Sequence, residues 1–471
     1  VAPGWNAIGA GEPALPGIAL GHNEHIAFGF TITGTDQQDL YVERLNPANP
    51  DEYWHKGAWA RMKVLRETIG IRGNPAGEPV ELRYTVHGPV LHQDRLRRHA
   101  YTLRWVGLEP GGAGYLAALA AARARNWTEF RAALARYKVP AENMVYADTS
   151  GNIGMVVAGL TPVRNNHTGL LAVPGTGEFE WTGYVTADQL PAVFNPPAHF
   201  VVTANNDIRP PGYPHILTYE WGPPYRAQRA SELLSQARKF TVADFERMQY
   251  DVVSVPARRF QAVLRRWRPP AGRLAEITQR IRGWNAEIAA DSAEALVFEI
   301  WFSQLGPALF GSSLGVRADT ELVLRRLESA ADLSVLRGTL ESTLHLIDRG
   351  LGSDMSRWRW SRANRLLFRH PLEQEKFNRG PMPRAGDAYT LNVSGGNGLQ
   401  YGEGASYRQV LDLADWDRST MTNAPGEVGD PANRHYDDLL PDWQTGRYHP
   451  MLYTRKAIEA ATVERIILEP R

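Results

Sequence analysis

Three short stretches of the chain carry residues whose type and spacing could do chemistry. Gly311-Ser312-Ser313-Leu314-Gly315 matches G-x-S-x-G, the turn that exposes a serine nucleophile in α/β hydrolases. That turn needs a strand before it and a helix after it, whereas residues 294–310 have the apolar spacing of a helix. We therefore interpret the match as a chance occurrence of a short motif.

The other two stretches could bind metals. His22 and His25 are three residues apart, which would suit a metal on one face of a helix, but their flanks look extended. A structural turn with hydrogen-bonded His22 and Asn23 is therefore favoured. The loop Asp36-Gln37-Gln38-Asp39 offers two carboxylates and backbone carbonyls, which are ligands for a hard cation such as calcium. Taken alone, it is equally typical of a solvated acidic turn.

Bulk properties of the 471 residues exclude several classes of protein. The 52 basic and 51 acidic residues give a net charge of +1, so no electrostatic footprint for nucleic acid or an anionic membrane is present. No apolar run is long enough for a membrane anchor. The absence of cysteine excludes disulfides, thiolate metal sites and cysteine nucleophiles. The 14 Trp residues and scattered acids leave a carbohydrate site open, although no carboxylate pair stands out.

Short extended runs dominate residues 17–203, so the predicted strands must position the histidines and carboxylates of residues 22–39. Period-two alternation predicts a strand over residues 80–86, and a hairpin is predicted around residues 148–152. Between them, residues 115–137 are predicted to form two helices, with Asn126 or Thr128 as the cap of the second.

The character of the sequence changes to helical spacing after about residue 232. Capping boxes are predicted at Thr241 with Asp244 and at Asp291 with Glu294. Strands return later, for example over residues 389–393, and a short helix is expected near residues 454–462. The predicted organisation is α+β, with a β-rich part at residues 1–235, a helical insertion at 236–355, and a return to the first body with a tail at 356–471.

Several motifs, in order along the whole chain, carry a resemblance to a known family. They are Ala14-Leu15-Pro16-Gly17-Ile18-Ala19-Leu20-Gly21-His22-Asn23, Asn143-Met144-Val145-Tyr146-Ala147-Asp148, Pro174-Gly175-Thr176-Gly177, Val202-Thr203-Ala204-Asn205-Asn206-Asp207, Trp221-Gly222-Pro223-Pro224-Tyr225-Arg226, Gly404-Ala405-Ser406-Tyr407-Arg408 and Asn423-Ala424-Pro425-Gly426. This collinear series resembles the penicillin acylase family of N-terminal nucleophile hydrolases.

The resemblance implies a four-layer αββα sandwich made by two chains cut from one exported precursor, in the periplasm or beyond. The second chain of such enzymes begins with a catalytic serine, whose own α-amino group is the base for attack on an amide carbonyl. By this resemblance, Asn205 is a side-chain donor and Ile32 a backbone donor to the oxyanion. Arg226 resembles the arginine that holds the surroundings of the nucleophile.

The same resemblance assigns Asp36, the carbonyl of Gln38 and Asp39 to a structural calcium loop. A further family aspartate falls near His215, so this ligand set departs from the family pattern. Leu20 and Phe30 are predicted walls of an apolar acyl pocket, with a core role as the alternative.

The expected function is hydrolysis of the linear amide bond of small acyl amides. Val1 aligns within the second chain, so the serine and the entire first chain have no counterpart here, and we expect the chain alone to be inactive. Two alternatives remain open: an inactive calcium-binding scaffold of this fold, and a secreted carbohydrate-active protein.

Overall fold

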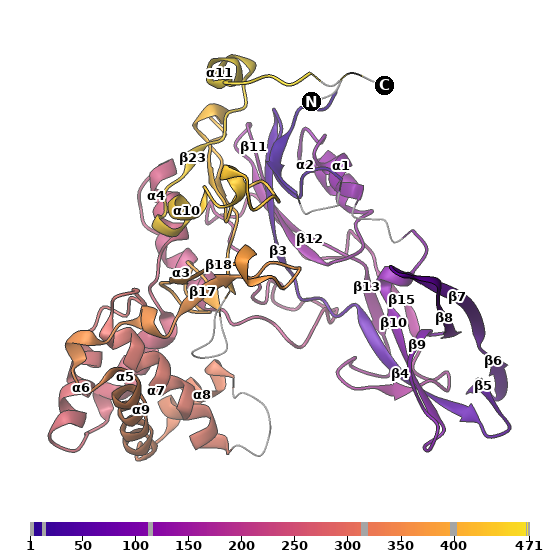
Figure 1. The fold of residues 1–471 in the computed structure, drawn as a ribbon, viewed down its shortest axis with the longest axis horizontal. Helices are drawn as coiled ribbons and strands as arrows, with labels where there is room; N and C mark the ends of the chain where they lie inside the picture. The colour runs from indigo at the N-terminus through magenta and orange to yellow at the C-terminus, as the bar shows by residue number, and fades with distance from the viewer. Residues whose placement is uncertain are drawn as a thin grey trace. The chain divides into compact units, whose positions relative to one another are not determined.

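A computed structural model describes residues 4–11, 16–111, 116–311, 319–395, 403–467 and 469. The chain divides into two compact units, Val1–Gly222 and Pro223–Arg471. Long strands dominate the first unit and helices the second, which confirms the mixed α and β content expected from the sequence (Figure 1). The three-segment division with boundaries at residues 235 and 355 stays a prediction.

A six-stranded antiparallel sheet lies in the first unit. Its strands, in spatial order, are β1 (Ile8–Ala10), β2 (Leu20–His22), β3 (Ile26–Ile32), β11 (Glu142–Asp148), β12 (Ile153–Ala158) and β16 (Ala192–Phe194). Helices α1 (Ala117–Ala121) and α2 (Trp127–Leu134) pack against it through an apolar core that includes Phe28, Phe130 and Tyr146. Asn126 accepts a hydrogen bond from the backbone N–H of Glu129 and is the cap of α2.

The second sheet of this unit has eight strands. They are, in spatial order, β6 (Ala58–Arg61), β5 (Asn49–His55), β4 (Gln38–Asn46), β10 (His99–Trp105), β9 (Gly88–Asp94), β8 (Asn74–Thr85) and β7 (Lys63–Ile71), with β14 (Val173–Pro174) parallel to β4. A separate pair consists of β13 (Thr161–Arg164) and β15 (Trp181–Val185), and a 3-10 turn spans Val106–Leu108.

Strand β4 lies inside the eight-stranded sheet, and its buried face is largely polar. Side chains alternate along a strand, so Asp39, Tyr41, Glu43 and Leu45 share one face, and all four are buried. Buried carboxylates are costly unless they are paired. The partners of Asp39 and Glu43 therefore determine what this face of the sheet can bind.

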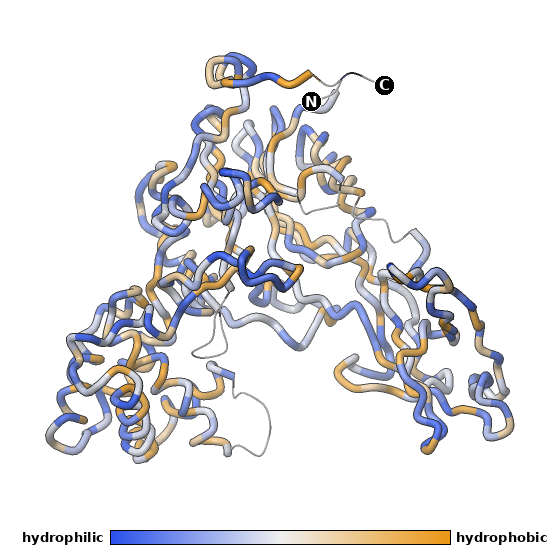
Figure 2. The backbone as a smooth tube through the Cα atoms, in the orientation of Figure 1, coloured by the Kyte–Doolittle hydropathy of each residue, from blue (hydrophilic) through white to orange (hydrophobic). Residues whose placement is uncertain are grey.

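The second unit is built around a helical core. Its helices are α3 (Tyr225–Leu234), α4 (Val242–Gln249), α5 (Val255–Arg266), α6 (Arg273–Gly283), α7 (Ala293–Phe310), α8 (Thr320–Ser329), α9 (Val335–Leu351), α10 (Leu440–Thr445) and α11 (Arg455–Ala461). Most residues of the largest buried apolar cluster in the described chain lie on α5 to α9, the fully buried Trp301 among them. Figure 2 shows apolar and polar residues mixed along these helices. No helix among the described residues has both the length and the apolar content needed to cross a bilayer.

Short strands and 3-10 turns complete the second unit. They are β17 (Arg365–Phe368), β18 (Arg379–Pro383), β19 (Ser394–Gly395), β20 (Glu403–Gly404), β21 (Arg408–Val410), β22 (Thr420–Thr422) and β23 (His449–Pro450), with 3-10 turns at Met355–Arg357, Trp360–Arg362, Glu375–Phe377, Trp416–Arg418 and Arg434–Tyr436.

Two local predictions are wrong, and in both places a side chain bonds to nearby backbone. Ser292 caps α7 in place of Asp291, because its hydroxyl accepts from the backbone N–H of Ala295. Residues 389–393 form a turn in place of a strand, because the Asp387 carboxylate accepts from the Tyr389 N–H and the Thr390 hydroxyl accepts from the Asp387 N–H. The capping box at Thr241 and Asp244 is confirmed.

Candidate active site

The two expected oxyanion donors lie in direct contact. The side-chain amide of Asn205 donates a hydrogen bond of 2.9 Å to the carbonyl of Ile32, the last residue of β3. The next residue, Thr33, donates its N–H to Ala141, so Thr33 faces the neighbouring chain segment and Ile32 faces the opposite side. The N–H and the carbonyl of one residue in an extended strand point the same way. The Ile32 N–H is therefore directed to the side on which the Asn205 amide lies.

The backbone at Asn205 is held in a special conformation. Its φ of +65° is in the left-handed region, which asparagine tolerates better than most residues. Its carbonyl accepts a hydrogen bond of 2.9 Å from the Gly222 N–H. A Cβ on Gly222 would lie 2.6 Å from that carbonyl oxygen, so this close approach requires glycine.

A polar network that the sequence analysis missed ties this segment to β3. The hydroxyls of Thr31 and Thr203 are 2.8 Å apart. The buried Asn143 amide donates to Thr31 Oγ1 at 3.1 Å, and Thr33 Oγ1 donates to Asn143 Oδ1 at 3.1 Å. The network positions the segment around Asn205 on both sides of Ile32. A signal was present, because Thr31 and Thr33 alternate around the expected backbone donor.

Asn206 has a local role. Its Oδ1 accepts from the Ala204 N–H at 3.0 Å, and its amide donates to the Asp207 carbonyl at 3.0 Å. The two adjacent asparagines thus differ: Asn205 reaches β3, whereas Asn206 shapes its own turn.

Phe30 and Leu20 have different surroundings. Phe30 lines an apolar pocket between β3, β11 and the two short helices, together with Phe28, Leu134 and Met144. Leu20 is half-buried on β2 and is not among the residues that line this pocket.

Arg226 belongs to the second compact unit, where it is the second residue of α3. It is half-buried, and burial lowers the pKa of its guanidinium. One turn further on, Arg229 forms a bidentate pair with the Asp251 carboxylate, with contacts of 3.0 and 2.6 Å.

The predicted calcium donors converge on an arginine. Arg164 Nε donates to Asp39 Oδ2 at 2.7 Å, and its Nη2 lies 3.2 Å from Asp36 Oδ2 and 3.4 Å from the Gln38 carbonyl. Burial raises the pKa of the Asp36 carboxyl, and the charge of Arg164 opposes that shift. The three groups predicted to bind calcium therefore contact a guanidinium through their oxygen atoms.

Two observations bear on whether a metal cation fits the same place. Asp39 Oδ1 is buried and has no hydrogen-bond partner among the described residues. A Cβ on Gly169 would lie 2.3 Å from Asp36 Oδ2 and 3.1 Å from Asp39 Oδ1, so the glycine leaves space between the two carboxylates. The donors suit calcium, but a cation at this position would compete with Arg164. The ring of His215 contacts Tyr213.

The other sequence motifs have simpler outcomes. The turn at His22 and Asn23 is confirmed: Asn23 Oδ1 accepts from the N–H groups of His25 and Ile26, and burial lowers the pKa of His22. Ser312 and Ser313 lie outside the described residues. The helix α7 that precedes them confirms that the strand required by a nucleophile turn is missing there.

Comparisons with known proteins show what the whole chain is similar to. A family model described as penicillin amidase matches residues 1–460. The chain is 27% identical to the penicillin acylase 2 proenzyme of Pseudomonas sp. (strain SE83), over 98% of this chain and 64% of that protein. It is 26% identical to the acyl-homoserine lactone acylase QuiP of Pseudomonas aeruginosa, over 95% of this chain and 61% of that protein. The chain thus spans less than two thirds of the length of these relatives.

A solved structure shows the same fold. A thermostable penicillin G acylase from Alcaligenes faecalis matches with a TM-score of 0.77 and 22% identity, over 100% of this chain and 93% of that chain.

Proposed function

Because the chain belongs to the penicillin amidase family, we propose that it forms the oxyanion-stabilising part of an enzyme that hydrolyses linear acyl amides. The observation that carries the proposal is the contact between the Asn205 side-chain amide and Ile32. Two aimed donors, one from a side chain and one from the backbone, are what the alkoxide of a tetrahedral intermediate requires. The Thr31, Thr203 and Asn143 network supports this role by holding both donors in place.

The proposed nucleophile is a serine at the start of the mature chain, supplied by sequence that is not part of these 471 residues. Its hydroxyl attacks the amide carbonyl while its own α-amino group takes the proton. The amine of the substrate then leaves, and water hydrolyses the acyl-serine ester. The 471-residue chain by itself is therefore expected to be inactive.

An apolar acyl group fits the pocket that Phe30 lines. The Pseudomonas relatives are acylases of penicillins and of acyl-homoserine lactones, and small acyl amides are accordingly the proposed substrate class. In this proposal Arg226 supports the surroundings of the serine, and Leu20 borders the acyl site next to Ala19, which lines the pocket.

The remaining proposals concern assembly. A second chain from the same precursor would complete a four-layer αββα sandwich, in the periplasm or outside the cell. Calcium would bind Asp36, Asp39 and the Gln38 carbonyl, in competition with Arg164. Neither the family match nor the relatives support an inactive scaffold or a carbohydrate-active protein.

Substitution of Asn205 in the complete, processed enzyme tests the function. Loss of one oxyanion donor costs about 3–4 kcal/mol of transition-state stabilisation, or roughly 10²–10³ in rate. Asn205→Ala should therefore lower kcat strongly and change KM much less, since the donor matters most once charge has developed. Steady-state kinetics with a chromogenic acyl anilide measure both constants.

Asn206→Ala is the matched control, because its contacts are confined to residues 204–207. It should keep a kcat close to that of the unsubstituted enzyme. A fully folded and processed Asn205→Ala enzyme with nearly normal kcat would remove the oxyanion assignment. A complete gene without a serine codon at the start of the mature chain would instead remove the proposed nucleophile.

A further inference from the structure

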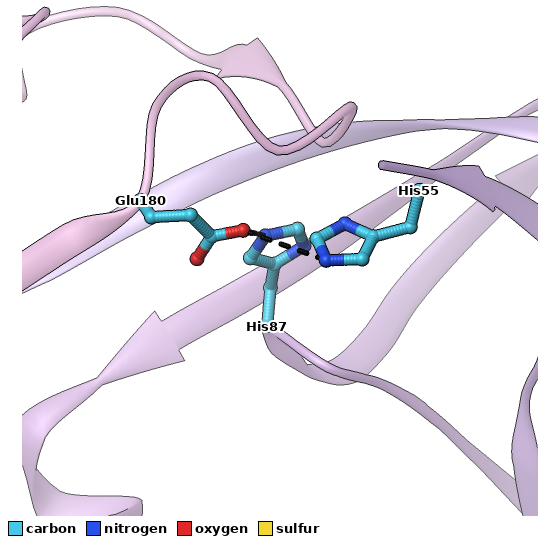
Figure 3. Close-up of side chains that lie close together, drawn as sticks. All are labelled: His55, His87 and Glu180. Carbon is cyan, nitrogen blue, oxygen red and sulfur yellow. Dashed lines mark hydrogen bonds and ion pairs between the residues drawn. The ribbon is translucent and has the colours of Figure 1, made fainter. Parts of the chain in front are cut away.

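A group of two histidines and a glutamate lies on the eight-stranded sheet of the first unit, brought together from three distant segments. His55 ends β5, His87 lies in the turn between β8 and β9, and Glu180 precedes β15. Figure 3 shows the three side chains pointing toward one another. Their ligand atoms all lie within 4.8 Å of one another, and this is the only such histidine and carboxylate group among the residues that the structure describes.

The hydrogen bonds of His55 determine which of its nitrogens is available. Its Nδ1 lies 3.2 Å from the Gly175 carbonyl, which can only accept, so Nδ1 carries the proton. In the neutral ring Nε2 then has a lone pair, and it faces Glu180 Oε1 at 3.8 Å. Two electron-rich atoms directed at each other repel, and a cation between them would turn that repulsion into two bonds.

His87, like His55, has its Nδ1 atom bonded to an oxygen acceptor, which in this case is a carboxylate. Its Nδ1 donates to Glu43 Oε1 at 2.7 Å, and its Nε2 lies 3.1 Å from Glu180 Oε1. A carboxylate bonded to the far nitrogen of a histidine is the usual partner of a metal-bound imidazole, because it orients the ring and increases its basicity. Tyr41 stacks on the ring at 3.9 Å and fixes its plane.

The charges of the cluster leave a demand for positive charge. Glu43 is fully buried, and its Oε2 has no hydrogen-bond partner among the described residues. Glu180 Oε2 contacts Arg104 at 3.4 Å, but Arg104 also contacts Glu109 at 3.5 Å. When both imidazoles are neutral, the two carboxylates of Glu43 and Glu180 therefore carry more negative charge than the shared arginine neutralises. A divalent cation would balance it.

The spacing and chemistry of the three atoms match one class of ion. Four-coordinate zinc, with bonds of about 2.0–2.1 Å, holds its ligand atoms roughly 3.3 Å apart. The two distances to Glu180 Oε1, 3.1 and 3.8 Å, lie on either side of that value, and all three ligand atoms lie within 4.8 Å of one another, so the side chains would draw together around a bound ion. Two imidazoles and one carboxylate are ligands of zinc, whereas calcium and magnesium prefer oxygen alone.

We propose that His55 Nε2, His87 Nε2 and Glu180 Oε1 bind one Zn²⁺ ion, with Glu43 as the residue that positions His87. The side chains of His55 and Glu180 are 14% and 21% exposed, so the ion has a path from solvent and a water molecule can be its fourth ligand. The bound ion would link the end of β5, the β8–β9 turn and the segment before β15. Its role is to fasten this part of the sheet, and it does not depend on the proposed acyl transfer.

Zinc titration of the full-length protein, freed of metal with a chelator, tests the site. Isothermal calorimetry with ZnCl₂ should give one site per chain, and Co²⁺ at the same site should show the visible absorption of a four-coordinate ion. His55→Ala and Glu180→Gln each remove a ligand and should weaken zinc binding by more than the roughly 10–100-fold expected for Glu43→Gln, which alters only the partner of His87.

His92→Ala is the matched control. His92 is an exposed histidine on β9 of the same sheet, outside the cluster, and its removal should leave zinc affinity unchanged. Glu180→Gln keeps the size of a partly exposed side chain, so it is informative even if His55→Ala fails to fold. The proposal is overturned if the unsubstituted protein shows no one-to-one binding, or if folded Glu180→Gln binds zinc within about tenfold of it.

Discussion

Two buried carboxylates on the same face of β4 have partners of different kinds. Asp39 Oδ2 accepts from Arg164 Nε at 2.7 Å and from the Trp181 indole, and the guanidinium brings a permanent positive charge. Glu43 Oε1 accepts from His87 and from the hydroxyls of Thr85 and Thr102. These donors bring no permanent charge with them.

The difference determines what each end of the strand can bind. An arginine has only donors, so Arg164 neutralises Asp39 and donates to the neighbouring acceptors of Asp36 and Gln38. A histidine has a second nitrogen. The Nδ1 atom of His87 bonds to Glu43, and its Nε2 atom is left to contact Glu180. Two carboxylates four positions apart on one strand are therefore bound by a permanently charged arginine in one place and by a histidine with a second ligand nitrogen in the other.

The largest effect is expected from removal of the guanidinium. Arg164→Met keeps most of the aliphatic volume but leaves Asp39 buried without its cation, which typically costs about 3–5 kcal/mol. Urea unfolding monitored by circular dichroism measures the loss. The control is Arg97→Met, since Arg97 is exposed and pairs with Asp94 at the surface, where an ion pair contributes about 0–1 kcal/mol. Equal losses in the two variants would show that the buried pair of Arg164 and Asp39 stabilises the fold no more than a surface ion pair does.

Calcium binding tests whether Arg164 occupies the place of a metal ion beside Asp39. If Asp36, Gln38 and Asp39 bind calcium in competition with Arg164, then Arg164→Met should bind it at least about tenfold tighter than the unsubstituted protein. At a calcium concentration about 100 times its Kd, the variant should recover about 2.7 kcal/mol of stability. Urea unfolding with and without CaCl₂ gives both values. A variant that does not respond to calcium would contradict the calcium proposal.

The smallest effect is expected at Glu43. Thr102→Val removes one hydroxyl donor without changing the side-chain shape, while His87 and Thr85 still donate to Glu43 Oε1. We expect a loss of about 1 kcal/mol in thermal unfolding. Thr68→Val, at an exposed position on β7, should lose almost nothing. A loss at Thr102 as large as that of Arg164→Met would mean that neutral donors stabilise a buried carboxylate as well as a guanidinium does.

Local signals in the sequence predicted several elements and caps, and collinear motifs located the residues of the candidate active site. The motif around Asn205 and the position of Ile32 come from a resemblance along the chain, and the structure brings these two residues into contact. The caps at Asn126 and Thr241 follow from rules that involve residues two or three apart. The cap signals are readable because both partners lie in the same short window, whereas Asn205 and Ile32 are 173 residues apart and were located only through the collinear resemblance.

The two clusters on β4 could not be predicted in this way. Arg164 contacts Asp39 from 125 residues away, and His87 and Glu180 are 93 residues apart. No spacing rule links such positions, since only the pairing order of the strands brings them together. The loop at Asp36 and Asp39 was recognised as anionic, but the identity of its cationic partner depends on the register of β13 and β15.

The alternation of side chains along β4 has a consequence for length variation in this family. Asp39 and Glu43 face the same way only because they are four positions apart, which is an even offset along the strand. One residue inserted before Asp39 within the paired strand would turn both carboxylates to the opposite face, and one inserted between them would turn only one. Insertions and deletions in this strand should therefore be far rarer in natural relatives than substitutions. Those that occur should add or remove two residues, because that change keeps both carboxylates on the same face.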